Sequence, residues 1–428
     1  MLKIASCLFV LGISLAAHAS DTTRVKPSAI VPDKDNAGLK LQPGFGALIV
    51  TDSLGKARHI VVNAQGSIYI KLSRLWKGKG IIELKDLNGD GRADNITGFG
   101  NYIGTGITIK DGYLYASSDD EIFRYKLNAA GDVVNPDAPE KLVTGLVNGK
   151  QHNTKSIVLD DKGNIYVNIG SPLNSCQLLD RVAGSKGQDP CPVLDKSGGV
   201  WQFRCDKQDQ SYAQGVRYAT GIRNVMGLDW NYQSNELFLM QHGRDQLDMF
   251  PDYYTKEQNA ELPAEVMYEI KPGGNYGWPY CFFDYKQKKN VVAPEYGGDG
   301  KKTERCDSFL SPVMAFPAHM APNALMFYTG NMFPEKYRNG AFIAFHGSWN
   351  RAPEKQEGYY VVFAPFKNGH PTGEWEVFAD NFSGVSEVMT PREAQHRPCG
   401  LAQGPDGSLY VTDDVKGRVY RIVYTGGK

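Results

Sequence analysis

The chain has no long apolar run beyond its first twenty residues and no excess charge of either sign. No later stretch approaches the roughly 18 apolar residues that a membrane helix needs, so we expect no transmembrane span. The 47 basic residues balance the 47 acidic ones, and the isoelectric point is about 7.1. This balance gives no electrostatic reason to expect nucleic acid or an anionic membrane as a partner.

The N-terminal residues predict export. Lys3 and an apolar segment over residues 4–17 precede Ala17-His18-Ala19, which has the small-x-small pattern of a signal-peptide cleavage site. We therefore expect a soluble periplasmic protein. The expected parts are a signal peptide over residues 1–19, an unstructured lead-in over 20–36 and one folded domain over 37–428.

Closely spaced cysteine pairs are also missing. No two cysteines stand in a C-x-x-C spacing, which argues against a zinc or thiol-redox site. Six of the seven cysteines follow the predicted signal peptide. An even number in an oxidising compartment favours disulfides and leaves the pairing open. We favour Cys281–Cys306, because these two flank one polar, glycine-rich segment.

Few helical patterns are present, whereas one turn-and-strand motif recurs six times. Each copy joins a turn rich in Asn, Asp and Gly to alternating small, apolar and aromatic residues. At about 40–50 residues per four-stranded blade, six copies predict an all-β, six-bladed β-propeller in which the motif forms an inner strand; a β-sandwich is the alternative. The copies lie at 65–70, 111–116, 162–167, 234–239, 338–343 and 406–411.

Two segments, 171–220 and 250–310, are longer than a blade needs. Loops of this length in a compact fold are usually functional. In a propeller they would rise over one face of the disc and surround a pocket above the central channel. We therefore expect the long loops to lie on the face that binds a ligand.

Asp86, Asn88 and Asp90 stand at positions 1, 3 and 5 of a loop that resembles the first part of an EF-hand calcium site. Position 12 is Thr97, where an EF-hand has a bidentate glutamate. The loop is therefore a candidate for calcium, with an ordinary turn between strands as the alternative.

Further polar clusters stand at corresponding places along the repeats. His152 precedes the third copy and suits a general base at neutral pH, although packed or solvated histidines are more common. Arg223 and Asn224 precede the fourth copy and offer donors suited to carboxylates and quinone oxygens. Gly243 and Asp245 follow it, where a backbone carbonyl and a carboxylate suit a hard cation, or form only a surface turn.

The other clusters lie at 273–280, 319–322, 346–351 and 396–401. They are rich in Arg, His and Asn and sit at matching edges of the predicted blades. Together the clusters predict one pocket for an anionic, planar ligand.

In this order the clusters resemble the soluble glucose and L-sorbosone dehydrogenase family that depends on pyrroloquinoline quinone (PQQ), and they are nearer to the sorbosone type. The likeness runs from about Gly38 to Tyr424. The residues that carry it are His152-Asn153-Thr154-Lys155-Ser156, Gly221-Ile222-Arg223-Asn224, Asn275-Tyr276-Gly277-Trp278-Pro279, His346-Gly347-Ser348-Trp349-Asn350-Arg351 and Arg397-Pro398.

This resemblance implies an oxidoreductase that oxidises an aldose or a sugar-derived aldehyde or alcohol. PQQ would lie above the channel with calcium, and an acceptor such as a periplasmic cytochrome or quinone would take the electrons. His152 would accept the substrate proton while Arg223 stabilises the charge on the quinone. Further implied contacts are calcium at Gly243, Arg244 and Asp245, and cofactor at Gln151, Asn224, His319, Arg351 and Arg397.

The sequence departs from the glucose enzymes at three of these places, and one of them is the stretch Gly243-Arg244-Asp245, which lacks their Gly-Pro pair. Gln151 stands where they have an aspartate, and Arg351 is the nearest equivalent of their basic residue under the quinone. Two other classes remain open. A lactonase-like hydrolase on six blades would need convergent Glu and Asp metal ligands, and a propeller that only binds a partner would not need His152 and several arginines at blade edges.

Overall fold

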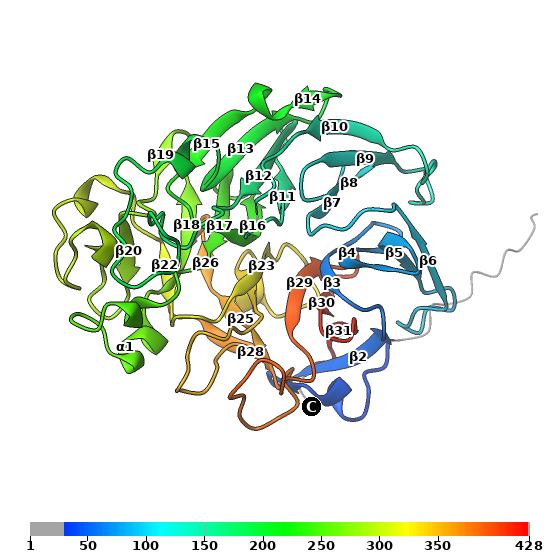
Figure 1. The fold of residues 1–428 in the computed structure, drawn as a ribbon. Helices are drawn as coiled ribbons and strands as arrows, with labels where there is room; N and C mark the ends of the chain where they lie inside the picture. Colours follow the sequence, from blue (N-terminus) through cyan, green and yellow to red (C-terminus); the bar gives the residue numbers. More distant parts are fainter. Residues whose placement is uncertain (1–29, 150, 427–428) are drawn as a thin grey trace, which may run out of the picture.

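The computed structural model describes residues 30–149 and 151–426. Six sheets of four or five strands form six blades, and the pairs β20–β21 and β26–β27 lie outside them. Figure 1 shows the six sheets arranged around a common centre. The predicted all-β, six-bladed β-propeller is confirmed.

In each of the first three blades, the four main strands follow one another along the chain from the centre of the ring outward. The first consists of β3 (Ala57–Val62), β4 (Ile68–Trp76), β5 (Lys79–Lys85) and β6 (Asn95–Phe99). The second consists of β7 (Ile107–Lys110), β8 (Tyr113–Ser117), β9 (Ile122–Lys126), β10 (Glu140–Thr144) and the added edge strand β14 (Gln210–Ser211). The third consists of β11 (Ile157–Leu159), β12 (Asn164–Ile169), β13 (Gly199–Arg204), β15 (Val216–Thr220) and the edge strand β19 (Gly274–Asn275).

The last three blades repeat the pattern. The fourth consists of β16 (Val225–Asn231), β17 (Glu236–Gln241), β18 (Glu265–Ile270) and β22 (Met314–Phe316). The fifth consists of β23 (Pro322–Phe327), β24 (Ala341–Phe345), β25 (Tyr360–Ala364), β28 (Glu376–Asp380) and the edge strand β1 (Lys40–Leu41). The sixth consists of β29 (Pro398–Gln403), β30 (Leu409–Asp413), β31 (Val419–Tyr424) and β2 (Phe45–Thr51).

Short elements decorate the loops. The strand pairs outside the blades are β20 (Cys281–Asp284) with β21 (Lys289–Val292), and β26 (Phe366–Lys367) with β27 (His370–Pro371). The helices are α1 (Lys256–Glu261) and the 3-10 turns η1 (Asn36–Gly38), η2 (Pro192–Asp195), η3 (Tyr212–Gln214), η4 (Leu247–Met249), η5 (Pro294–Tyr296), η6 (Cys306–Ser308) and η7 (Glu335–Tyr337). Among the described residues, none of these helices is long and apolar enough to cross a membrane.

The recurring motif forms the second strand of each blade, which is an inner strand of its sheet. The motif residues lie in β4, β8, β12, β17, β24 and β30, whereas β3, β7, β11, β16, β23 and β29 line the channel. The turn in each motif is the hairpin between the innermost and the second strand. A hairpin signal in the sequence does not reveal which of its two arms faces the channel.

The N-terminal strand closes the ring. β2 pairs with β31, so the sixth blade combines both ends of the described chain. Phe45 of β2 packs edge-on against Phe333 and Phe378, with ring centroids 4.8 and 4.9 Å away. The end of the predicted lead-in is fixed to the same strand, because Asp33 N–H donates to the Ala47 carbonyl at 2.8 Å. Residues 1–29 lie outside the described residues.

Antiparallel pairing brings most of the predicted polar clusters to one mouth of the channel, whereas the cluster at 273–280 lies at the outer edge strand β19 and does not line the cavity there. Val225 at the start of β16 pairs with Gln241 at the end of β17, and Pro398 of β29 pairs with Asp413 of β30 in the same way. Innermost strands therefore begin where second strands end. The residues just before each innermost strand and just after each second strand meet at this mouth.

The two long loop regions carry the disulfides. Cys281–Cys306 is confirmed, and Cys176 pairs with Cys191. Among the described cysteines, Cys205 and Cys399 are free. Figure 1 places β20 and α1, which belong to the second loop region, outside the ring of blades.

Candidate functional site

An open cavity of about 340 Å³ lies at the mouth of the channel where the innermost strands begin. Most of the predicted site residues line it, and several blades contribute. The predicted residues that line it are His152, Arg223, Asn224, Gly243, Asp245, His319 and Arg397. The cavity walls also include Arg58, Asn153, His242, Glu265, Asn323, His346 and Trp349, which the sequence analysis did not assign individually.

Buried polar atoms without partners gather around this cavity. Four of them belong to lining residues: Arg58 Nε, Asn153 Oδ1, Asn224 Oδ1 and Asn323 Oδ1 lack a hydrogen bond within the described structure. Buried polar atoms in proteins are nearly always bonded. The cavity therefore fits a ligand with several hydrogen-bonding groups, and its arginines favour an anionic one.

His152 is held as a neutral imidazole. Its Nδ1 lies 2.6 Å from the Ser171 carbonyl, which can only accept, so Nδ1 carries the proton and Nε2 keeps its lone pair. Burial, with Arg223 nearby, lowers the pKa of His152 to about 3. Its φ of 53° is unusual for a residue other than glycine, and such strain is concentrated at functional sites. The arrangement can accept a proton at Nε2.

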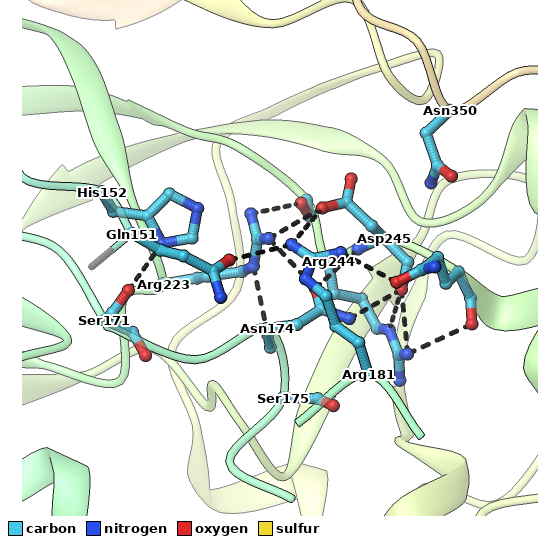
Figure 2. Close-up of polar contacts among 12 residues, drawn as sticks. Gln151, His152, Ser171, Asn174, Ser175, Arg181, Arg223, Arg244, Asp245 and Asn350 are labelled. Carbon is cyan, nitrogen blue, oxygen red and sulfur yellow. Dashed lines mark hydrogen bonds and ion pairs between the residues drawn. The ribbon is translucent and has the colours of Figure 1, made fainter. Parts of the chain in front are cut away.

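Two arginines converge on Asp245 (Figure 2). Asp245 Oδ2 accepts from Arg223 Nη2 at 3.0 Å and from Arg181 Nη2 at 2.9 Å. Burial alone would raise the pKa of Asp245, but Arg223, His319 and Arg181 hold it at about 2. Asp245 is therefore a carboxylate at any physiological pH.

Glu265 adds a second acidic group that the sequence analysis missed. Its Oε2 accepts from Gly243 N–H at 2.9 Å and its Oε1 from Ala321 N–H at 3.2 Å. Burial raises its pKa to about 7, and a bound cation would favour the ionised form. The only sequence signal was one acidic residue at the start of the apolar strand β18.

The oxygen atoms of this region suit calcium. Asp245, Glu265 and the Gly243 carbonyl are hard donors beside the cavity. Gly243 O also accepts from Arg223 Nη1 at 2.9 Å, and a carbonyl has a second lone pair for a cation. Within the described ranges, no cluster of three or more His, Cys, Asp or Glu side chains forms a metal site by itself. A cation here would need carbonyls and the ligand to complete its shell.

Arg351 does not line the cavity, and its role as a cofactor contact stays a prediction. Its Nη1 donates to the carbonyls of Ala260 at 2.6 Å and Ala318 at 3.2 Å. Its Nη2 pairs with Glu261, and its Nε donates to Lys355 O at 3.1 Å. The guanidinium therefore fixes α1 and the segments beside it.

Gln151 and Arg244 also point their side chains elsewhere. Gln151 Nε2 donates to Asp180 Oδ2 at 3.0 Å, within the loop that follows β12. Arg244 forms a buried ion pair with Glu295 in the second loop region. Neither side chain lines the cavity. The predicted calcium contact of Arg244 concerns its backbone carbonyl and stays a prediction.

The Asp86 loop lies between β5 and β6, outside the cavity. Asp86 Oδ1 and Oδ2 each accept from a loop amide at 2.7 Å, those of Gly89 and Gly91, and Asn88 Oδ1 accepts from Asp90 N–H at 2.8 Å. These bonds give the loop its shape without an ion. Calcium at Asp86, Asn88 and Asp90 stays a prediction.

Arg58 lies in β3, the innermost strand of the first blade, and places its side chain at the same mouth. Its Nη1 lies 3.4 Å from Asp414 Oδ2. The rule that located Arg223 and Arg397 would have found it, because it too lies near the start of an innermost strand. Arg58 stands before the first motif copy at 65–70, as Arg223 stands before the fourth, and no polar cluster in the sequence marks it.

The protein is thus a six-bladed propeller whose channel opens into a cavity rich in arginine, histidine and asparagine. The sequence model of the TrAA12-like family matches residues 39–425. The chain therefore belongs to this family.

Curated relatives and solved structures extend the comparison. The chain is 25% identical to the pyrroloquinoline quinone-dependent pyranose dehydrogenase of Coprinopsis cinerea, over 90% of this chain but 54% of that protein, and so spans about half of its length. It is 21% identical to the pyrroloquinoline quinone-dependent sugar dehydrogenase of Hypocrea jecorina, over 88% of this chain and 87% of the relative.

Two solved structures share the fold. The calcium structure of the Trichoderma reesei protein of Carbohydrate-Active Enzymes Family AA12 has a TM-score of 0.73 at 19% identity, over 90% of this chain and 97% of that one. The holo form of the Coprinopsis cinerea pyranose dehydrogenase PQQ domain has a TM-score of 0.71 at 21% identity, with the same coverage.

Proposed function

We propose that this protein is a PQQ-dependent dehydrogenase that oxidises an aldose or a sugar-derived aldehyde or alcohol, with calcium as its metal. The observation that carries the proposal is the cavity at the channel mouth, where arginines and unpartnered buried polar atoms converge. PQQ is a planar tricarboxylate, which matches this surface. The family and the names of the curated relatives support the same reading.

Bound in the cavity, the quinone would supply the hydride acceptor. His152 Nε2 would accept the proton of the substrate hydroxyl, because its Nδ1–H is already committed to Ser171. Arg223 and Asn224 would bind quinone oxygens, and Arg397 a carboxylate. Gly243 and Asp245 would hold the calcium, with the Arg244 carbonyl as a further ligand.

The finer assignments belong to the same proposal. The stretch His346-Gly347-Ser348-Trp349-Asn350-Arg351 supports a sorbosone-type substrate, whereas the curated relatives are named as a pyranose dehydrogenase and a sugar dehydrogenase. A signal peptide over residues 1–19 would direct the protein to the periplasm, where a cytochrome or a quinone would take the electrons. The folded domain would span 37–428.

Reconstitution of the purified protein tests the proposal. We expect dye reduction with a panel of aldoses, pyranoses and L-sorbosone only when PQQ and calcium are both present. A chelator should abolish the activity and added calcium should restore it. Absence of dye reduction across the panel would contradict the proposal, and hydrolysis of a sugar lactone in the same panel would favour the lactonase-like alternative.

His152→Ala tests the proposed base. We expect turnover to fall on the order of 10²-fold, the usual scale of general-base catalysis, while the PQQ dissociation constant measured by calorimetry stays within about threefold. His370→Ala is the control, because His370 is exposed on β27 and does not line the cavity. Full turnover of the His152 variant at saturating PQQ would place the base elsewhere.

A further inference from the structure

One short segment of the first long loop, residues 171–174, touches three of the proposed site residues. Ser171 N–H donates to the Arg223 carbonyl at 2.8 Å, and its own carbonyl accepts from His152 Nδ1 at 2.6 Å. Asn174, at the end of the segment, reaches Arg223 and Asp245 (Figure 2). The loop following β12 is therefore built into the site.

The Asn174 side chain pairs with the main chain of Asp245. Its Oδ1 accepts from Asp245 N–H at 2.9 Å, and its Nδ2 donates to Asp245 O at 2.9 Å. The amide thus bonds both the N–H and the carbonyl of one residue, which is how a paired β-strand bonds its neighbour. This pairing fixes both peptide groups of Asp245, including the one that carries the Arg244 carbonyl.

The same residue also holds the Arg223 guanidinium. Asn174 Oδ1 accepts from Arg223 Nη2 at 3.0 Å, and Asn174 O accepts from Arg223 Nε at 3.1 Å. Asn174 O accepts from Trp278 Nε1 as well, at 3.0 Å. Asn174 is fully buried, and the Cys176–Cys191 disulfide anchors the loop directly after it.

We propose that Asn174 is a positioning residue that sets both the Arg223 guanidinium and the peptide groups at Arg244–Asp245 relative to the cavity. The proposal rests on the proposed function for the roles of Arg223 and the calcium-binding carbonyls. An aspartate at this position would keep the acceptor for Arg223 but place a carboxylate oxygen against Asp245 O. An alanine would lose all three side-chain bonds.

Two variants separate these contacts, and one control matches them. Asn174→Asp keeps the volume and the side-chain contact with Arg223 but loses the donor to Asp245 O. Asn174→Ala loses the side-chain bonds to both Arg223 and Asp245, and in both variants the main-chain carbonyl of residue 174 still accepts from Arg223 Nε. Asn231→Asp is the control. Asn231 is also buried, with Nδ2 donating to Gly369 O at 3.4 Å and Oδ1 accepting from Gln233 N–H at 2.9 Å, but it lies at the other end of β16.

Three measurements follow the variants. In the cofactor-free protein, amide hydrogen exchange over residues 242–247 should be about tenfold faster in both Asn174 variants than in Asn231→Asp, because a buried hydrogen bond is lost. The calcium concentration for half-maximal PQQ binding, followed by calorimetry, should rise about tenfold in both. Turnover at saturating PQQ and calcium should fall about tenfold in Asn174→Ala and under about threefold in Asn174→Asp.

Exchange rates and calcium requirements equal to those of Asn231→Asp would overturn the positioning role. So would equal losses of turnover in the two Asn174 variants, because only Asn174→Ala removes the side-chain acceptor for Arg223 Nη2. Failure of the wild-type protein to bind PQQ would contradict the proposed function instead. In that case the exchange measurement alone still decides whether Asn174 fixes the Asp245 peptides.

Discussion

At the scale of single residues, the role of an arginine depends on which of its donors are already used. Arg397 lines the cavity. Its Nε donates to the His346 carbonyl at 3.0 Å, and its Nη2 donates to the Gly347 carbonyl. Within the described structure its Nη1 has no protein acceptor and is free for a ligand. Arg351 has all its donor groups committed to protein, so it supports the fold rather than the cofactor.

Arg397→Ala should therefore weaken PQQ binding. We expect a loss of about 1.5–3 kcal/mol, the size of a charge-assisted hydrogen bond. Turnover at saturating PQQ should change much less than in His152→Ala. Calorimetric titration of the cofactor-free variant with PQQ in excess calcium measures the loss, and an unchanged affinity would show that the carboxylates bind elsewhere.

Arg351→Ala should instead lower the stability of the fold and leave PQQ affinity nearly unchanged. It removes the ion pair with Glu261 and the bonds that tie α1 to its neighbours, so we expect unfolding in urea to be easier by about 2–3 kcal/mol. PQQ affinity should stay within about threefold of wild type. A large loss of affinity with unchanged stability would return Arg351 to the cofactor site.

At the scale of elements, the pairing of β2 with β31 closes the ring of blades. Phe45 begins this strand and lies in an aromatic cluster with Phe333, Tyr337, Phe378 and Tyr424. These rings come from the fifth and sixth blades and the loop between β23 and β24. The cluster therefore joins the N-terminal strand to the last third of the chain.

Phe45→Ala should destabilise the whole propeller. Removing a buried phenylalanine costs about 3–5 kcal/mol through lost burial and the cavity left behind. We expect a lower midpoint in urea by circular dichroism, with Val134→Ala as the control, because Val134 is exposed. A Phe45 variant as stable as this control would show that closure does not depend on the aromatic cluster.

At the scale of the whole molecule, buried titratable groups set the response to pH. Burial lowers the pKa of five imidazoles, and it raises that of two carboxyls to about 7. The imidazoles are His59, His152, His242, His319 and His346, and the carboxyls are Asp229 and Glu265. Below pH about 6.5 the unfolded imidazoles bind protons that the folded ones do not.

The five imidazoles bind more protons on unfolding than the two carboxyls release. The unfolded state therefore holds more protons than the folded state, and the free energy of unfolding should rise with pH. We expect the thermal midpoint of the cofactor-free protein to increase from pH 5 to 6.5 and to level off near pH 7. His59→Gln keeps a donor for the Asn323 carbonyl and should flatten the slope. A midpoint that stays level or falls over this range would contradict the expectation.

Local patterns in the sequence determined the architecture. A hairpin needs only a turn and two alternating segments, so its sixfold recurrence was visible and predicted six blades. The same repeats placed His152, Arg223, Asn224, Gly243, Asp245 and Arg397 at blade edges, and antiparallel pairing brings all of them to one cavity. The Cys281–Cys306 bridge followed from its short, polar intervening segment.

Tertiary structure alone decided which donors and acceptors remain free. Arg351 and Arg397 look alike in sequence, yet only Arg397 retains a donor at the cavity. Glu265 and Asn174 carried no motif, because their importance comes from partners far along the chain, such as Ala321 and Asp245. A sequence records the chemical type of each side chain, whereas its role depends on burial and on partners that only the folded chain supplies.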